Sequence, residues 1–404
     1  MAQTQKVSLP DGGVTWTVLD RDYAVVQPVE QWLEWLRVAC ACSPNTVKAY
    51  SRGLALWWHY LEETGVNWRD PGLTALSGFI GWLNNGDLPT AHRRPGKPAA
   101  CGPRTVSLRL AALASFYEWS ERQYGTVTPR LGRTRRDPAF QPFLAHLRDR
   151  RHDQPAALVP RRRWHTGPTP VFLPAQVQRI LDAAATFDSA DRSWAGNLRD
   201  RLLFEVLAET GLRLGEVLGV RHEDWVVGRG ATPYIRVVPR DDNPNGARVK
   251  NMRGRRVFVS DRLERLYGEF LYQVGDLADR HGLPLRDTDP VLVNTGGGRL
   301  LSAMTPSGVY RVVERLQGRL GTSVPPGWTP HWFRHTHATA LLLNGVPEHV
   351  VMRRLGHAQV QTTLDLYGWV TEEAELRSVA EWRGYAQGWR LPSMPDNPAD
   401  QGER

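Results

Sequence analysis

The 404-residue chain has few cysteines and no long apolar segment, which argues against several classes of protein. Its three cysteines, Cys40, Cys42 and Cys101, are odd in number and lack paired Cys-x-x-Cys spacing, so we predict neither a disulfide framework nor a zinc site. No stretch approaches the roughly 20 apolar residues that a membrane-spanning helix needs, and the N-terminal MAQTQKVSLPDGG has no signal-peptide core. We therefore expect a cytoplasmic protein with no membrane partner.

The composition fits a soluble protein with a basic surface. The hydrophobic share of 41% and the charged share of 23% are ordinary for globular domains, and the length suffices for two domains with separate cores. A net charge of +9 fits a polyanionic partner, although many basic proteins bind none. The distribution of the charge is more informative than its total.

A basic segment divides the chain into two halves. Between Arg130 and Arg163 there are ten arginines and three acidic residues, interrupted by prolines, which predicts a linker instead of a long helix. Such a linker is often only solvated. Because this one lies between two folded halves, we favour a strap that crosses a DNA backbone, where neutralised phosphates release counterions. Its last arginines are Arg161, Arg162 and Arg163.

The N-terminal half predicts a small helical domain. Helical apolar spacing occurs in residues 29–43, 43–65, 73–84 and 103–125. Ser43 or Asn45 is expected to cap the second helix, and Gly65 to end it. The tryptophans in these helical patterns are expected in the core and not as base-stacking platforms; they are Trp57, Trp58, Trp82 and Trp119.

The C-terminal half predicts helices with a short antiparallel sheet. Helices are expected at 172–187, 197–211, 261–282, 305–321, from 331 onward and at 347–356, with further helices around 361–369 and 371–384. Strands are expected at 234–239 and 255–260, joined by an Asn-, Pro- and Gly-rich turn. The fold class is thus mainly α with a small antiparallel β-sheet, divided into an N-terminal extension (1–24), a helical domain (25–150), a basic linker (151–168), an α+β domain (169–390) and a disordered tail (391–404).

Arg213 lies in TGLRLGE, where Gly211 can end one helix and allow the next to begin near Leu214. Taken alone, this arginine could be an exposed helix flank. Glu216 could hold its guanidinium in one orientation, which a phosphate-binding arginine needs.

Lys250 lies in the turn between the two strands, and taken alone it would be read as an exposed surface lysine without a special role. With cations nearby to lower its pKa, it could instead protonate a leaving oxygen.

Four candidates lie between His331 and Tyr367. His331 and Arg334 are one helical turn apart and project from one face, as donors to a phosphate would; an accidental pairing is the alternative. The neighbouring His335 and His337 are expected on other faces, as packing or polar fillers. His357 follows Gly356 after a helix and could be a cap or a loop residue. Tyr367 in LDLYGW could be an ordinary core tyrosine.

In this order and these contexts, Arg213, Lys250, His331, Arg334, His357 and Tyr367 resemble the active-site set of the tyrosine recombinase (phage integrase) family. TGLRLGE resembles the first arginine box, HWFRHTHAT the histidine-xx-arginine box, LGH the third box and LDLY the nucleophile box. SPNTVKAYSRGLALWWHYL is similar to the family's helical core-binding domain. Where many members have a histidine two residues after the tyrosine, this chain has Trp369.

The resemblance implies a site-specific DNA recombinase that works without metal or other cofactor. Tyr367 would attack the scissile phosphate to form a 3′-phosphotyrosyl intermediate, while Arg213 and Arg334 stabilise charge on the nonbridging oxygens. Lys250 would act as general acid, His331 as proton acceptor and His357 as a further phosphate donor. A type IB topoisomerase-like enzyme and a non-catalytic DNA-binding accessory protein are the alternatives.

The resemblance also implies partners. These are double-stranded DNA recombination sites, three further copies of the chain in a tetramer on DNA, and accessory DNA-bending or recombination proteins, so we expect association with the nucleoid. The segment after Tyr367 is expected to dock on a neighbouring subunit, or else to fold back on its own domain. Contacts to DNA from the helical domain are expected from Lys48, Arg52, Arg104 and Arg109.

Overall fold

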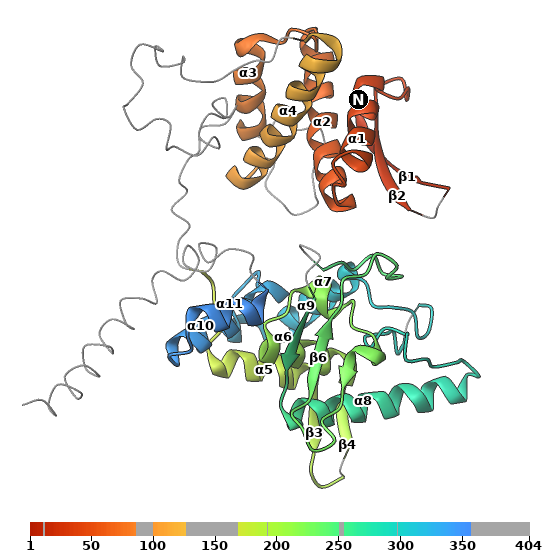
Figure 1. Cartoon of the computed structure of the whole chain (residues 1–404). Coiled ribbons are helices and arrows are strands. Elements are labelled where there is room, and N and C mark those ends of the chain that lie inside the picture. The colour runs from red at the N-terminus through yellow and green to blue at the C-terminus, as the bar shows by residue number, and fades with distance from the viewer. Residues whose placement is uncertain are drawn as a thin grey trace, which may run out of the picture. The chain divides into compact units, whose positions relative to one another are not determined.

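The computed structural model describes two compact units, which divide between Trp164 and His165 (Figure 1). The described residues are 1–10, 13–85, 100–126, 169–191, 193–249, 254–296 and 298–356. The basic linker, the expected helices after residue 356 and the expected C-terminal tail therefore lie outside them. None of the described helices is both long enough and apolar enough to cross a bilayer.

The N-terminal unit contains the four expected helices and a β-hairpin. The helices are α1 (Gln27–Val38), α2 (Pro44–Thr64), α3 (Gly72–Asn85) and α4 (Pro103–Tyr124), and the antiparallel hairpin consists of β1 (Gln3–Ser8) and β2 (Val14–Leu19). The hairpin packs against α2. No strand was expected in this segment, because the residues that β2 buries are Thr15, Thr17 and Val18, and two polar residues among three hide the buried face.

The expected helix signals in α2 are confirmed. The Ser43 hydroxyl accepts the Thr46 amide at 3.3 Å, and Gly65 ends the helix with a φ of 68°. Trp57 is fully buried, as expected of a core residue, and its Nε1 donates to the Tyr117 hydroxyl at 2.9 Å. The other three helical tryptophans are partly buried against the same core.

The C-terminal unit is mainly helical, as expected (Figure 1). Its three-stranded antiparallel sheet has the order β5-β6-β7, in which β6 and β7 are the two expected strands. The strands are β5 (Trp225–Val226), β6 (Tyr234–Val237) and β7 (Arg255–Phe258), and the helices are α5 (Pro174–Ala184), α6 (Leu198–Thr210), α7 (Leu214–Val217), α8 (Asp261–Arg280), α9 (Pro306–Leu320), α10 (Pro330–Leu343) and α11 (Glu348–Leu355).

The helix expected over 172–187 is wrong at its end. Residues 185–188 form β3 (Ala185–Asp188), which pairs with β4 (Ser193–Gly196). The Asn197 amide donates to the Ala184 carbonyl at 2.8 Å, and Arg201 Nη1 donates to the Ala185 carbonyl at 3.0 Å. Donors at the start of α6 therefore form hydrogen bonds with the carbonyls at the end of α5, and the helix ends there.

α6 lies at the centre of this unit, in contact with α5, α8 and α10. It is buried on almost every side, which explains its weak apolar periodicity. Its buried charges are paired: Arg199 with Asp200 at 2.7 Å, and Arg201 with Glu205 at 2.8 Å. The end of this rigid helix carries the first candidate site residue.

Candidate active site

The turn after α6 holds Arg213 in a defined orientation. Gly211 ends α6 with a φ of 64°, and Arg213 is the N-cap of α7, which begins at Leu214 as the sequence predicts. The expected contact with Glu216 is present: a Glu216 carboxylate oxygen accepts the Arg213 amide at 2.9 Å and the other accepts Arg213 Nη1 at 3.0 Å. The Arg213 side chain is 21% exposed and that of Glu216 is fully buried.

Glu216 has a second partner, which is not among the site residues predicted from the sequence. Arg255, the first residue of β7, donates from Nη1 and Nη2 to the two Glu216 oxygens at 3.1 and 2.8 Å. Burial alone would raise the pKa of the Glu216 carboxyl, but the hydrogen bonds and charges of Arg255 and Arg213 lower it below its usual value. Glu216 is therefore ionised at neutral pH and holds both arginines.

Arg334 on α10 is 2% exposed and donates to two backbone carbonyls. Its Nη1 donates to the Gly211 carbonyl and its Nη2 to the Leu355 carbonyl, both at 2.8 Å. These bonds link α10 to the end of α6 and to the end of α11. They bring Arg334 to the turn that carries Arg213.

Three arginines surround the C-terminal end of α11. Arg255 Nε donates to the Arg354 carbonyl at 2.9 Å, Arg334 to the Leu355 carbonyl, and Arg213 Nη1 and Nη2 to the Gly356 carbonyl at 3.4 Å. The last carbonyls of a helix lack intrahelical partners and carry partial negative charge, so cations stabilise them. The arrangement concentrates positive charge directly before residue 357.

The histidines of α10 have different surroundings. The exposed His331 lies beside His335, with ring centroids 4.4 Å apart and rings nearly perpendicular, so the expectation that His335 lies on another face is wrong. Residues four apart share a helix face. Burial, with the charges of His331 and Arg334, lowers the pKa of His335 to about 4.

His337 is a polar packing residue, as expected. Its Nδ1 lies 3.0 Å from the Ala208 carbonyl, and its Nε2 accepts from Arg354 Nε at 3.0 Å. Since Nε2 accepts, the proton of the neutral ring is on Nδ1. Burial and the charge of Arg354 lower the pKa of His337 to about 4. The ring thus joins α10 to α6 and α11.

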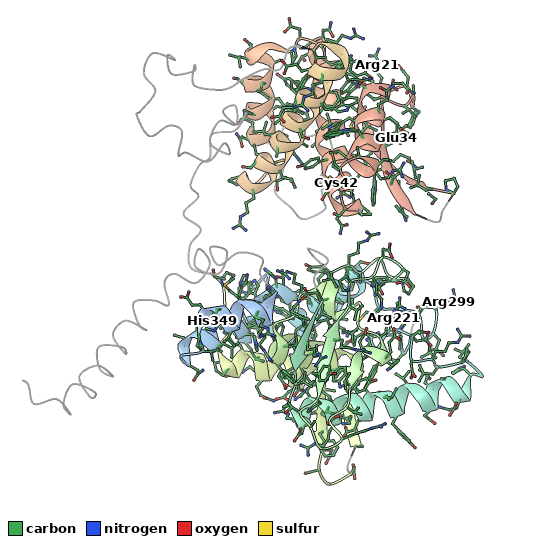
Figure 2. The ribbon with its side chains drawn as sticks, in the orientation of Figure 1. Arg21, Glu34, Cys42, Arg221, Arg299 and His349 are labelled. Atoms are coloured by element: carbon green, nitrogen blue, oxygen red, sulfur yellow. The ribbon has the colours of Figure 1, made fainter. Side chains whose placement is uncertain are left out.

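The segment that leads to Lys250 is anchored beside α7. Asn245 Nδ2 donates to the carbonyls of Leu218 and Met304, each at 2.9 Å. A Cβ on Gly215 would lie 2.9 Å from the Arg248 carbonyl oxygen, so only glycine allows this approach of segment and helix. Arg221, labelled in Figure 2, adds an ion pair with Asp242 at 2.7 Å.

The structure therefore brings Arg334 of α10, with His331 one turn before it, to Arg213 and Glu216, which are distant from it in the sequence. Three of the sequence candidates lie outside the described residues: Lys250, His357 and Tyr367. The DNA-contact candidates Arg161, Arg162 and Arg163 lie outside them as well.

The other DNA-contact candidates lie in the N-terminal halves of α2 and α4. These helices run in the same direction, because Gly53 lies against Ala112 while Trp57, one turn later, bonds to Tyr117. Their N-terminal ends are thus adjacent. Arg52 and Arg104 are exposed, Lys48 Nζ lies 5.3 Å from the ring centre of Trp16, and the half-buried Arg109 donates to Cys101 Sγ at 2.5 Å.

Comparison with known proteins identifies the family of the chain. Residues 170–373 match the phage integrase family, and residues 29–124 match the N-terminal SAM-like domain of phage integrases. The chain belongs to the phage integrase family of tyrosine recombinases. The expected family is thus confirmed, and one of the two matches lies in each unit.

Relatives and solved structures agree with this family. Transposase A from transposon Tn554 of Staphylococcus aureus is 30% identical over 353 residues, which cover 87% of this chain and 90% of the transposase. Tyrosine recombinase XerD of Listeria monocytogenes is 26% identical over 344 residues, 85% of this chain and 94% of XerD. As a phage integrase family member the chain is an enzyme that recombines DNA, and neither the topoisomerase nor the non-catalytic alternative is favoured.

Two solved structures share the fold. The Tn1549 transposon integrase in complex with transposon right end DNA aligns with a TM-score of 0.56 and 17% identity over 87% of this chain and 99% of the integrase. The XerH site-specific recombinase bound to palindromic difH substrate aligns with a TM-score of 0.53 and 17% identity over 88% of this chain and 85% of XerH. The helical class with small antiparallel sheets is therefore confirmed as that of the phage integrases.

Proposed function

We propose that this tyrosine recombinase cuts and rejoins double-stranded DNA at specific sites through a covalent bond between Tyr367 and the 3′-phosphate of the cut strand. The observation that carries the proposal is the convergence of Arg213 and Arg334 on the end of α11, where both donate to neighbouring carbonyls. They come from positions 121 residues apart. A phosphate at this point would meet two guanidinium groups held by the fold.

The two arginines would stabilise the charge that grows on the nonbridging oxygens in the pentacoordinate transition state. Donors fixed in advance are effective because they need no reorganisation as the charge develops. Arg213 is held by the buried carboxylate of Glu216 and Arg334 by two carbonyls, which supports this role. Removing one donor of this kind costs roughly 3 to 4 kcal/mol of transition-state stabilisation.

The remaining candidates would move protons. As the Tyr367 oxygen forms its bond to phosphorus, His331 would take the phenolic proton, and Lys250 would protonate the 5′-oxygen as the phosphorus–oxygen bond breaks. His357, which directly follows Gly356, would donate to the phosphate. A phenol with a pKa of about 10 is protonated at neutral pH, so it needs this base and the nearby cations.

The N-terminal unit would bind the same DNA. The adjacent N-terminal halves of α2 and α4 would present Arg52 and Arg104, helped by Lys48 and Arg109, while Arg161 to Arg163 in the linker would contact the DNA backbone. Four copies would assemble on two duplexes, with the segment after Tyr367 docked on a neighbouring copy and with accessory DNA-bending proteins. Such an enzyme would be cytoplasmic and associated with the nucleoid.

Trapping the covalent intermediate tests the proposal. Duplexes that the enzyme binds would first be selected from a random-sequence pool and then prepared with a nick near the cleavage point, so that the released fragment diffuses away. We expect a protein–DNA adduct on a denaturing gel with the wild-type enzyme and none with Tyr367→Phe. No adduct on any bound duplex, or an adduct that persists in Tyr367→Phe, would contradict the proposal.

A further inference from the structure

We propose that Arg255 is a positioning residue for recombination, which directs Arg213 toward the scissile phosphate by occupying Glu216. The inference rests on the role proposed above for Arg213. It adds a residue that lies outside the set of six and that does not itself contact the reacting atoms. Its position at the start of β7, directly after the turn with Lys250, is far from Arg213 in the sequence but adjacent in the fold.

The division of the Glu216 oxygens between two arginines is the main argument. One oxygen accepts from Arg213 Nη1 and Arg255 Nη1, and the other accepts from Arg255 Nη2 and the Arg213 amide. Arg255 thus makes the two-bond contact with the carboxylate, and the Arg213 guanidinium makes a single bond. An arginine and a carboxylate prefer the two-bond geometry. Without Arg255, the Arg213 guanidinium would be drawn onto Glu216 and away from the phosphate.

A second contact connects Arg255 to the residues directly before His357. Its Nε donates to the Arg354 carbonyl, next to the carbonyls that Arg334 and Arg213 contact. A Cβ on Gly356 would lie 2.6 Å from Arg255 Nη1, so the guanidinium lies directly against this glycine. Gly356 also has a φ of 67°, which favours glycine. Arg255 therefore sets the distance between Glu216 and the residue that precedes His357.

The charges of Arg213, Arg255 and Glu216 together favour the binding of an anion. Two arginines share one buried carboxylate, and the side chains of Arg255 and Glu216 are 10% and 0% exposed. One positive charge is thus not neutralised by Glu216, and among the described residues carbonyl dipoles at the end of α11 lie against it. Because Arg255 is held in the two-bond contact, the uncompensated charge lies on Arg213, which is the more exposed of the two.

The test compares cleavage rates and DNA affinities of Arg255 variants. We expect Arg255→Met to form the covalent adduct on a nicked duplex about 10- to 100-fold more slowly in single turnover, as small misplacements of reacting groups do. The dissociation constant for the duplex should change less than about 3-fold, since the Arg255 side chain is 10% exposed and is bonded to Glu216, and we propose no contact between it and the DNA. Arg255→Lys keeps the charge but cannot make the two-bond contact, so it should recover little of the rate.

A double-mutant cycle separates positioning from a general structural defect. If Arg255 acts through Arg213, the double variant Arg213→Ala with Arg255→Met should cleave no more slowly than Arg213→Ala alone. Arg201→Met is the matched control, because Arg201 is buried and bonds to Glu205, Asp182 and the Ala185 carbonyl away from the site. Arg201→Met should be less stable than the wild-type enzyme. In assays at temperatures well below its melting temperature, it should cleave at the wild-type rate.

Three results would overturn the inference: wild-type rates in Arg255→Met, full rescue by Arg255→Lys, or multiplicative losses in the double variant. If Arg255→Met does not fold, the same comparisons with Arg255→Lys decide the question. These results can be told apart from a failure of the proposed function, because in that case the wild-type enzyme would form no Tyr367 adduct at all.

Discussion

Arg334 donates from Nη1 to the carbonyl oxygen of Gly211 at 2.8 Å, which joins α10 to the turn that leads to Arg213. Gly211 also lies where a side chain would collide with its neighbours: a Cβ would be 2.7 Å from His337 Cδ2 and 2.8 Å from Leu355 Cδ2. Gly211, the first glycine of TGLRLGE, thus ends α6, accepts a hydrogen bond from Arg334 and allows α10 and α11 to pack closely.

We expect Gly211→Ala to destabilise the C-terminal unit by more than the roughly 1 to 3 kcal/mol that a left-handed non-glycine residue costs. Gly345→Ala is the matched control, because Gly345 has a φ of 76° and nothing within 4 Å of its Cβ position. Urea unfolding measures both free energies. Equal losses in the two variants would show that the contacts around Gly211 can relax.

Glu216→Gln should both destabilise the enzyme and slow cleavage. Breaking a buried ion pair typically costs about 3 to 5 kcal/mol, because charges remain buried without their partner. The control is Glu205→Gln, since the Glu205 carboxylate is 8% exposed and also lies between two arginines, Arg201 and Arg262. Both variants should unfold at lower urea concentration, but only Glu216→Gln should lower the single-turnover rate of adduct formation.

The stability of the C-terminal unit should fall in acid through His337. Its pKa is about 4 in the folded chain against an ordinary 6.5, so between these values the unfolded chain binds a proton that the folded chain does not. The contribution is complete above pH 6.5 and is lost as the pH falls toward 4, and at pH 4 the loss of stability amounts to about 3 kcal/mol. His335 adds to the same dependence.

Urea unfolding at several pH values between 4 and 7 tests this expectation. His337→Gln can keep an acceptor for Arg354 and a donor for Ala208 while losing the titration. Its unfolding free energy should therefore change less with pH than that of the wild-type enzyme. The expectation fails if the two pH dependences are the same.

Arg52 and Arg104 should contribute to DNA binding through phosphate contacts. Each contact that is lost should reduce the slope of log affinity against log salt concentration by about 0.9. We expect the double variant Arg52→Gln with Arg104→Gln to lower the slope by about 2 in titrations from low to moderate salt. Arg122→Gln is the control, because the exposed Arg122 lies in the last turn of α4, at the opposite end of that helix from Arg104. An unchanged slope in the double variant would remove these arginines from the interface.

Local signals predicted the helices well. Ser43 and Gly65 mark the ends of α2, and Gly211 marks the end of α6, because capping and left-handed glycine depend on residues close in sequence. The strands were less predictable. β5 has two residues, too few for a period, and the β3–β4 hairpin begins where contacts from Asn197 and Arg201 end α5.

The sequence by itself determined the family, the fold class and six candidate residues, because boxes such as TGLRLGE and HWFRHTHAT are contiguous and their residue types are specific. Only the tertiary structure decided that Arg213, Arg334 and Arg255 meet at the end of α11, and that Glu216 holds two arginines instead of one. The reason is physical. Unsatisfied carbonyls and a buried carboxylate select their partners by distance in space, and the spacing of residues along the chain carries no record of that distance.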